Sequence, residues 1–392
     1  MVKSVRLADI SSLITKGTTP TTLGFDYQEN GINFLKIECF EDNGTFIPEK
    51  VTHISSECHD KLKRSQLQSG DILFSIAGAI GRVSIVTEEM LPANTNQALA
   101  IIRIDNPEVY VPYVKLILQS PVIKKQFERK KQGVAQLNLS LNDINGLTIP
   151  LTNFSQQIEY VQLFDRIESI IANRKQELQS LDDLIKARFV EMFGDPETGK
   201  SIYATNKLKE LSVKISDGVH AKPDYTNSGR PFLSVVNINK KKIDFSDCKY
   251  VSEEAYQKMI KSTHPEKGDI LYTKVGATYG IPAYVDTDTK FCLYVSVCLI
   301  KPNHEKINSR FLAMQMDMPF VKHQADKRIK GIGVPDLHLN QIGDFDIICP
   351  PRQEQDVFVA FVEQIDKSKF AVQKALEKGQ LLFDSLTQQF FG

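Results

Sequence analysis

The chain carries the same sequence framework twice, and this internal repeat restricts its possible folds more than any other feature. The tetrapeptide GDIL at 70–73 recurs at 268–271, which is 198 residues later. The segment LNDI at 141–144 is matched by LNQI at 339–342 with the same offset, and FVEMFG and TQQFFG close the two copies. Because the period has the size of a domain, we expect two similar domains rather than a solenoid of short units.

The two copies differ most in their loops. The offset changes only near the start, where Gly17 aligns with Gly218, and beyond this point KGTTPTT in the first copy faces DGVHAKP in the second. Surface loops tolerate such insertions and substitutions at little cost. Two domains that share a framework but differ in their loops are expected to recognise two different targets.

Composition and motif searches indicate an ordinary globular protein without catalytic chemistry. The 392 residues suggest two to three domains, and the sequence shows neither a long apolar run nor an N-terminal apolar signal core. We therefore expect a cytoplasmic protein that does not contact membranes. The net charge is zero, so any contact with nucleic acid must come from local patches.

No familiar catalytic, nucleotide or metal motif is present. The sequence has no GxxxxGK[ST] loop, no GxGxxG fingerprint, no HExxH and no CxxC pair. The glycine-rich stretches at 78–81 and 276–280 follow strand-like runs and are interpreted as tight hairpins, and the CPP at 349–351 lacks the residues of a methyltransferase site. We expect reduced, buried cysteines, no metal site and no cofactor in this chain.

Each copy combines a β-like segment with a helical segment, which predicts an α+β fold. Short β-like runs separated by turn residues fill 1–150 and about 205–350, whereas 155–192 and 353–390 lack proline and repeat their apolar positions at helical spacing. Helices of about 36 residues would be roughly 54 Å long. A heptad pattern favours a coiled coil, with a buried helix of a compact domain as the alternative. The predicted seam and partner-docking positions are Phe164, Ile171, Leu178, Ile185, Val362, Ile365, Leu376 and Phe383.

Basic residues occur at equivalent places in both copies. KKQFERKKQG at 124–133 aligns with KHQADKRIKG at 322–331, and each segment leads into a glycine-containing loop. One such patch is usually a solvated helix face, but two matched patches favour contact with DNA phosphates. The predicted residues are Lys124, Arg129, Lys130, Lys131, Lys322, Lys327, Arg328 and Lys330.

Polar and aromatic loop residues are candidates for reading base edges. Arginine pairs with guanine, and asparagine or glutamine pairs with adenine, in the major groove. In the first copy the candidates are Lys16, Thr18, Thr19, Arg82, Asn94, Asn96, Gln97 and Gln136. In the second copy they are His220, Lys222, Tyr225, Lys274, Thr278 and Tyr279.

The order of these segments resembles the specificity (S) subunit of type I restriction-modification systems over essentially the whole chain. The doubled GDIL, followed by P-x-x-x-Q and a long helix ending in FG, carries the resemblance, although the first copy reads TIPLTNFSQQ where the pattern prefers PPxxEQ. The resemblance implies two homologous mixed α/β target-recognition domains joined by two long antiparallel helices, as a pseudo-two-fold repeat. The implied regions are 1–152 and 195–350 for the domains, and 153–194 and 351–392 for the helices.

The resemblance also implies the function and the partners. Each domain would read one half of a bipartite asymmetric site in double-stranded DNA, while the helices fix the spacer. The chain would do no chemistry itself. It would bind two modification subunits, and through them the restriction and translocase subunits, on which S-adenosylmethionine, ATP and Mg would bind.

Two rival classes stay open at this point. The chain could be a DNA methyltransferase or nuclease with an unrecognised site, which binding of S-adenosylmethionine to the isolated chain would favour. It could also be a coiled-coil protein scaffold, which binding insensitive to salt and to DNA sequence would favour.

Overall fold

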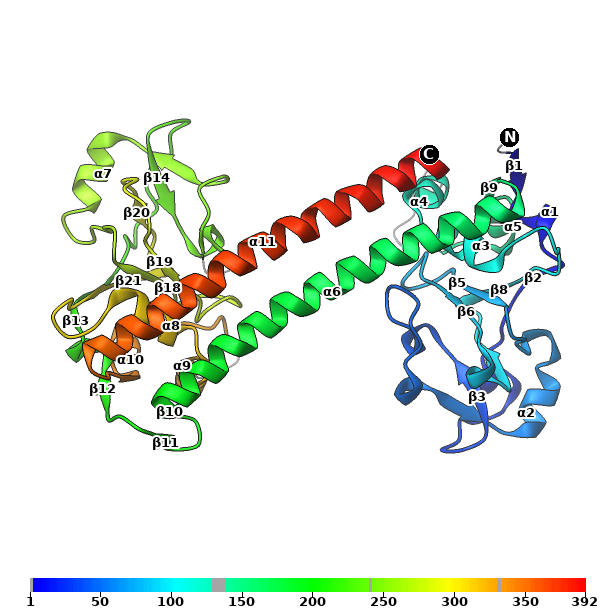
Figure 1. Cartoon of the computed structure of the whole chain (residues 1–392), viewed down its shortest axis with the longest axis horizontal. Coiled ribbons are helices and arrows are strands. Elements are labelled where there is room, and N and C mark those ends of the chain that lie inside the picture. The colour runs from blue at the N-terminus through cyan, green and yellow to red at the C-terminus, as the bar shows by residue number, and fades with distance from the viewer. Residues whose placement is uncertain (1–2, 129–137, 240–241, 330–332) are drawn as a thin grey trace. The chain divides into compact units, whose positions relative to one another are not determined.

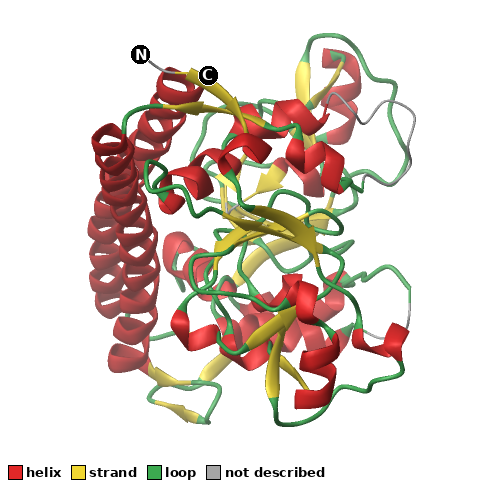
Figure 2. Ribbon diagram, turned by 90° about the vertical axis from the view of Figure 1, so that its right-hand side faces the viewer, coloured by secondary structure: helices red, strands yellow, loops and turns green. Residues whose placement is uncertain are grey.

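The computed structural model describes residues 3–128, 138–239, 242–329 and 333–392 (Figure 1). The chain divides into two compact units, of which the first is Met1–Lys175 with Lys374–Gly392 and the second is Gln176–Gln373. Helices and strands are mixed throughout (Figure 2). Within the described residues, no helix has the length and apolar character needed to cross a membrane.

The first unit is built on a four-stranded antiparallel sheet and a smaller three-stranded sheet. Strands β5 and β8 are central in the larger sheet, and their apolar runs ILFS and LAII are fully buried. The larger sheet has the order β2 (Leu13–Lys16), β8 (Leu99–Arg103), β5 (Ile72–Ser75) and β6 (Val83–Ile85). The smaller has the order β4 (Thr52–Ile54), β3 (Ile32–Leu35) and β7 (Ala93–Thr95), and β1 (Lys3–Arg6) pairs with β9 (Thr148–Leu151). The short helices are α1 (Leu7–Ile10), α2 (Ser56–Lys61), α3 (Val111–Leu118), α4 (Pro121–Glu128) and α5 (Leu141–Asn145).

The second unit repeats this plan. Its larger sheet has the order β13 (Ser212–Asp217), β21 (Val297–Pro302), β18 (Ile270–Thr273) and β19 (Pro282–Tyr284). Its three-stranded sheet has the order β17 (Lys249–Val251), β14 (Arg230–Leu233) and β20 (Cys292–Leu293). The two-stranded pairs are β12 (Thr205–Lys207) with β22 (Asp346–Ile348), β10 (Gly194–Asp195) with β11 (Lys200–Ser201), and β15 (Ile238–Asn239) with β16 (Lys242–Ile243). The short helices are α7 (Glu253–Met259), α8 (Ser309–Met316), α9 (Pro319–Arg328) and α10 (Leu339–Gly343).

The structure confirms the predicted repeat at the level of strand order. Each unit contains one parallel pair, β3 with β7 and β14 with β20, in otherwise antiparallel sheets. Helices α3, α4 and α5 begin 198 residues before α8, α9 and α10. The two glycine-rich stretches are confirmed as turns of hairpins, because they join antiparallel β5 to β6 and β18 to β19.

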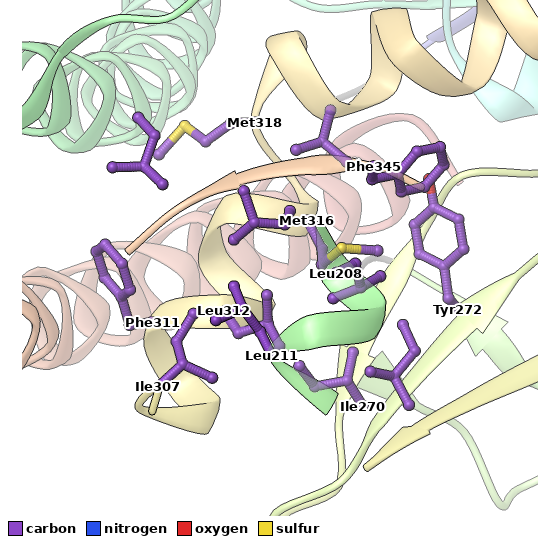
Figure 3. Packing of buried hydrophobic residues seen from close by; sticks show 14 of the residues in the cluster. Leu208, Leu211, Ile270, Tyr272, Ile307, Phe311, Leu312, Met316, Met318 and Phe345 are labelled. Carbon is purple, nitrogen blue, oxygen red and sulfur yellow. The ribbon is translucent and has the colours of Figure 1, made fainter. Parts of the chain in front are cut away.

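The core of each unit lies between its larger sheet and the helix that follows the last strand of that sheet. In the second unit, Phe311, Leu312 and Met316 of α8 pack with Ile270 and Tyr272 of β18 (Figure 3). All five side chains are fully buried. The apolar faces of α8 and β18 therefore hold the sheet and the helix together.

The two long predicted helices are confirmed. Helices α6 (Phe154–Phe193) and α11 (Arg352–Phe391) have 40 residues each, which corresponds to about 60 Å (Figure 1). In the first unit the ring of Tyr160 stacks on Phe390, with ring centroids 4.2 Å apart. In the second unit Phe189 contacts Phe358 at 5.6 Å. Since high numbers on one helix meet low numbers on the other, the helices run antiparallel within each unit.

A buried glutamine attaches the start of each long helix to its domain. The side-chain oxygen of Gln355 accepts from the Asn308 backbone N–H at 2.7 Å, and its amide nitrogen donates to the Pro350 carbonyl at 2.7 Å. Gln157 makes the same two kinds of contact, with the Tyr110 N–H at 2.8 Å and the Thr152 carbonyl at 2.8 Å. Gln157 and Gln355, which align at the offset of 198, are thus structural residues.

Candidate nucleic-acid interface

In the first unit, several predicted loop residues gather at one end of the larger sheet. Lys16 ends β2 and the segment before β8 contains Gln97, so the antiparallel order brings these positions to the same end. The Thr19 hydroxyl donates to the side-chain oxygen of Gln97, which links the two loops. Asn96 is half-buried and accepts a hydrogen bond from the Ala98 N–H at 3.1 Å. Lys16 and Thr18 are half-buried beside them.

Two predicted base contacts in the first unit have structural roles instead. Asn94 is fully buried in β7, where its amide donates to the Leu62 carbonyl and to the Ser65 hydroxyl, each at 3.1 Å. Its predicted position in an exposed loop is wrong. Arg82 donates to the Phe40 carbonyl at 2.7 Å and pairs with Asp42. Because Asn94 and Arg82 make these contacts inside the unit, we do not assign them to DNA.

The corresponding sheet end of the second unit contains an ion cluster around a buried lysine. Lys274, only 5% exposed, follows β18, and its ammonium lies 3.6 Å from Asp217 and 3.3 Å from Asp336. Asp217 ends β13, and Asp336 lies in the loop between α9 and α10. The cluster therefore joins three segments, and Lys274 holds the loop rather than facing solvent as predicted. The exposed His220 approaches Asp217 at 3.5 Å.

The basic helix α9 of the second unit is only partly available to a ligand. The ammonium of Lys322 pairs with Asp326 at 2.5 Å and lies 3.5 Å from the ring centre of Tyr279. The Tyr279 hydroxyl donates to the same carboxylate at 2.6 Å. Arg328 donates to the Gln324 carbonyl at 2.7 Å, whereas Lys327 is exposed and has no ion-pair partner within the described residues. Thr278 is also exposed.

The matching patch of the first unit is described only in part. Lys124 lies exposed on α4, as predicted, with no ion pair to any residue that the structure describes. Four other predicted residues of this patch and its loop, and one of the second unit, lie outside the described residues: Arg129, Lys130, Lys131, Gln136 and Lys330.

Beyond the ion cluster, the loop after β13 presents a lysine and a tyrosine to solvent. Lys222 and Tyr225 are exposed, and the Lys222 ammonium lies 5.7 Å from the centre of the Tyr225 ring. The Lys249 ammonium of β17 lies closer to the same ring, at 4.4 Å. Tyr225 rests on buried Phe232, with ring centroids 5.8 Å apart. Of the predicted residues, Tyr225 and Lys222 are thus brought together.

The first unit contains an equivalent tyrosine that the sequence prediction missed. Tyr27 rests on Phe34 at 5.6 Å, and the ammonium of Lys36 lies 4.0 Å from the centre of its ring. Both Tyr27 and Phe34 precede Tyr225 and Phe232 by 198 residues. The offset of the repeat was the signal that would have identified Tyr27.

Comparison with protein families agrees with this duplicated arrangement. The model of the type I restriction modification DNA specificity domain matches residues 1–182 and 203–379, which covers most of both copies. The chain belongs to this DNA specificity domain family. The resemblance seen in the sequence motifs is thereby confirmed.

Individual relatives and solved structures of the specificity domain family extend the comparison. The type I restriction enzyme EcoBI specificity subunit of Escherichia coli is 33% identical over 170 residues, which are 41% of this chain and 35% of that protein. The chain thus spans about a third of the length of that curated relative. A chain from a study of complex assembly and conformational transition of the type I R-M system gives a TM-score of 0.63 at 17% identity, covering 99% of this chain and 96% of its own. The type I restriction-modification system S subunit from M. genitalium gives a TM-score of 0.56 at 14% identity, with coverages of 100% and 96%. These two likenesses show the two-domain fold.

The predicted seam residues of the specificity domain chain face inward. Phe164 is buried against Phe383, with ring centroids 5.0 Å apart, and Ile171 is buried near Gly379. The other seam positions are buried or half-buried: Leu178, Ile185, Val362, Ile365, Leu376 and Phe383. These side chains are therefore placed to pack within each unit, and their docking of a partner stays a prediction.

The cysteines of the specificity domain chain are free thiols. Cys39, Cys58, Cys292 and Cys298 are buried, and burial raises the pKa of Cys292 to about 12. Within the described residues, no group of three or more His, Cys, Asp or Glu side chains is placed to hold a metal ion.

Proposed function

We propose that the chain is the DNA-reading specificity subunit of a type I restriction-modification complex, with each domain reading one half of a bipartite asymmetric site. The observation that carries this proposal is the pair of matching sheet ends, on which a common framework presents different side chains. Lys274 and Asp217 occupy the places of Ile76 and Lys16 in the first unit. Different side chains on a shared framework suit the reading of two different half-sites.

The exposed and half-buried residues at these ends, together with lysines of α4 and α9, are the proposed DNA contacts. Lysines that form no ion pair with an Asp or Glu of the described residues are proposed to contact phosphates. The polar loop residues next to them are proposed to contact bases. The residues that we propose are Lys16, Thr18, Thr19, Asn96, Gln97, Lys124, His220, Lys222, Tyr225, Thr278 and Lys327. The predicted residues outside the described ranges, Arg129, Lys130, Lys131, Gln136 and Lys330, remain part of this proposal.

We propose that α6 and α11 form a coiled coil that sets the spacer between the half-sites and docks the modification subunits. The inward seam leaves apolar side chains exposed elsewhere on the helices, and exposed apolar groups are suited to protein contacts. In the first unit Ile170 is 52% exposed and Leu381 is 68% exposed, and in the second unit Phe370 is 61% exposed. These residues are proposed docking positions in addition to the predicted seam residues.

The partners in this proposal carry the chemistry. Two modification subunits would methylate adenine with S-adenosylmethionine, and restriction and translocase subunits would use ATP and Mg, while this chain supplies no catalytic group. The proposed regions are 1–152 and 195–350 for target recognition, and 153–194 and 351–392 for the helices.

The test is a map of methylated adenines in cells that carry the chain with its modification subunits, compared with cells that lack it. The expected result is a split asymmetric motif that depends on the chain. A chimera that replaces residues 205–348 with those of another family member should change one half of the motif only. A complete complex that binds DNA without sequence preference, or a chimera that alters both halves, would overturn the division into one reader per domain.

A further inference from the structure

We infer that Tyr27 with Lys36, and Tyr225 with Lys249, form two equivalent sites that each bind one DNA backbone phosphate. This inference rests on the proposed function, to which it adds a pair of contacts that do not read sequence. The sequence-based prediction of DNA contacts did not include Tyr27, Lys36 or Lys249. Each site lies within a single unit.

The two tyrosines have the same geometry. Each ring meets a buried phenylalanine of the first strand of the three-stranded sheet at an interplanar angle of 59°, with centroids 5.6 Å apart at Phe34 and 5.8 Å apart at Phe232. Tyr27 is 36% exposed and Tyr225 is 37% exposed. Packing on the phenylalanine therefore holds each ring in place, while part of each tyrosine stays exposed to solvent.

A lysine lies over each tyrosine, but the two lysines come from different places in the repeat. Lys36 follows β3, and the residue 198 positions later is Ser234. Lys249 begins β17, and the residue 198 positions earlier is Val51. Since neither lysine has a lysine as its counterpart, the cation beside the tyrosine is not simply inherited with the repeated framework.

The phenol groups are free to donate to a ligand. Neither the Tyr27 nor the Tyr225 hydroxyl has a hydrogen-bond partner in the part of the chain that the structure describes, whereas the Tyr279 hydroxyl donates to Asp326 and the Tyr113 hydroxyl to the Pro150 carbonyl. Burial raises the pKa of Tyr27, and the nearby Glu38 and Cys58 add to this effect. The phenol therefore stays protonated at neutral pH and remains a donor.

A phenol hydroxyl and an ammonium group that lies over the same ring suit a phosphate better than a base edge. Both groups donate hydrogen bonds, and backbone phosphates are bound by lysine and tyrosine side chains in DNA-binding proteins. The two units differ in their reading loops yet keep this tyrosine, as expected for a contact that carries no sequence information. The lysine also supplies the charge that makes such binding depend on salt.

The test measures the affinity of the complete complex for double-stranded DNA containing its methylation motif, over a range of salt concentrations. Tyr27→Phe and Tyr225→Phe keep the ring and remove only the donor, and each should weaken binding about tenfold. Lys36→Gln and Lys249→Gln should weaken binding and each reduce the slope of log affinity against log salt by about 1. The motif found by methylation mapping should not change in any of these variants.

The matched control is Tyr284→Phe. Arg310 lies 4.6 Å from the centre of this ring, so the pair has the same chemistry, but it belongs to a cavity of about 360 Å³ lined by residues of α6, α8 and α11. This variant should bind DNA like the wild type. Thermal unfolding of all five variants checks that the fold is intact.

Three outcomes would overturn the inference, and they differ from one another. Phenylalanine variants with wild-type affinity would remove the phosphate contact while leaving the proposed function in place. A changed base at one half-site in Tyr27→Phe or Tyr225→Phe would assign the residue to base reading. A wild-type complex that does not bind DNA would overturn the proposed function together with this inference.

Discussion

At the scale of single residues, Gly17 and Gly218 explain how the loops after β2 and β13 leave the sheet. A Cβ atom at Gly17 would lie 1.8 Å from the Thr95 carbonyl oxygen, and one at Gly218 would lie 2.0 Å from the Leu293 carbonyl oxygen. Both distances are far below any real contact, and the obstacle in each case is backbone. The shared glycine therefore lets the loop cross closely over the neighbouring strand.

Gly218→Ala is expected to destabilise the chain by about 2–4 kcal/mol, because the strand or the loop must move to admit the methyl group. Denaturant unfolding measures this change. Gly333→Ala in the same unit is the control, since nothing lies within 4 Å of a Cβ placed there, and it should differ from the wild type by less than about 0.5 kcal/mol. Equal unfolding free energies for the two variants would contradict the close approach.

Lys274→Met is expected to destabilise the chain by about 3 kcal/mol, because it leaves Asp217 and Asp336 without their shared counter-ion. The triple variant Lys274→Ile, Asp217→Asn and Asp336→Asn should recover part of this loss, as Ile76 occupies the equivalent position in the first unit. Unfolding free energies test both statements. If Lys274→Met left the stability unchanged but altered one half of the methylated motif, Lys274 would instead be a base-reading residue.

At the scale of elements, the start of each long helix depends on one amide side chain. Gln355 is 1% exposed and connects the first turn of α11 with Asn308 and Pro350. Without it, a buried backbone N–H and a buried carbonyl lose their partners. The helix would then be less firmly attached to its domain.

Gln355→Ala should lower the unfolding free energy by about 2 kcal/mol, because the cost of unsatisfied buried polar groups exceeds the gain in helix propensity. Gln364→Ala on the exposed face of the same helix serves as the comparison and should be neutral within about 0.5 kcal/mol. Calorimetry or denaturant titration measures the unfolding free energy of both variants. Similar unfolding free energies would argue against an anchoring role for Gln355.

Helices and hairpins could be predicted from the sequence where the residues that determine them are close together in the chain. The helical segments near 155–192 and 353–390 follow from apolar spacing, and the hairpins at 78–81 and 276–280 follow from glycine. The environment of Asn94 was not predictable, because its partners Leu62 and Ser65 lie about 30 residues away in the sequence. Lys274 was misjudged for the same reason, since its acids belong to two distant segments.

At the scale of the whole molecule, α6 and α11 are each shared between the two compact units. The boundaries fall at Lys175 in α6 and at Gln373 in α11. Residues inserted at both boundaries would lengthen the helices without interrupting either unit. In the proposed function, the helices are therefore the place at which the spacer can be changed without changing either half-site.

Insertion of one heptad after Lys175 and another after Gln373 should lengthen the spacer of the methylated motif by about three base pairs, because seven helical residues add about 10 Å. Both half-sites should stay the same. An insertion into only one helix should misalign the seam and abolish methylation. If the paired insertion left the spacer unchanged, the helices would not act as the ruler.

Sharing the helices also sets an order of events during synthesis. Phe391 is buried in the first unit, against Tyr113 and Phe164, yet it is translated long after them. Ribosomes add about 5–20 residues per second, so the 198 residues of Gln176–Gln373 take roughly 10–40 s to make. During that time the nascent first unit lacks Lys374–Gly392, which contains the C-terminal part of α11. The second unit is complete as soon as Gln373 has been added. The domain that is translated first is thus the one that is completed last.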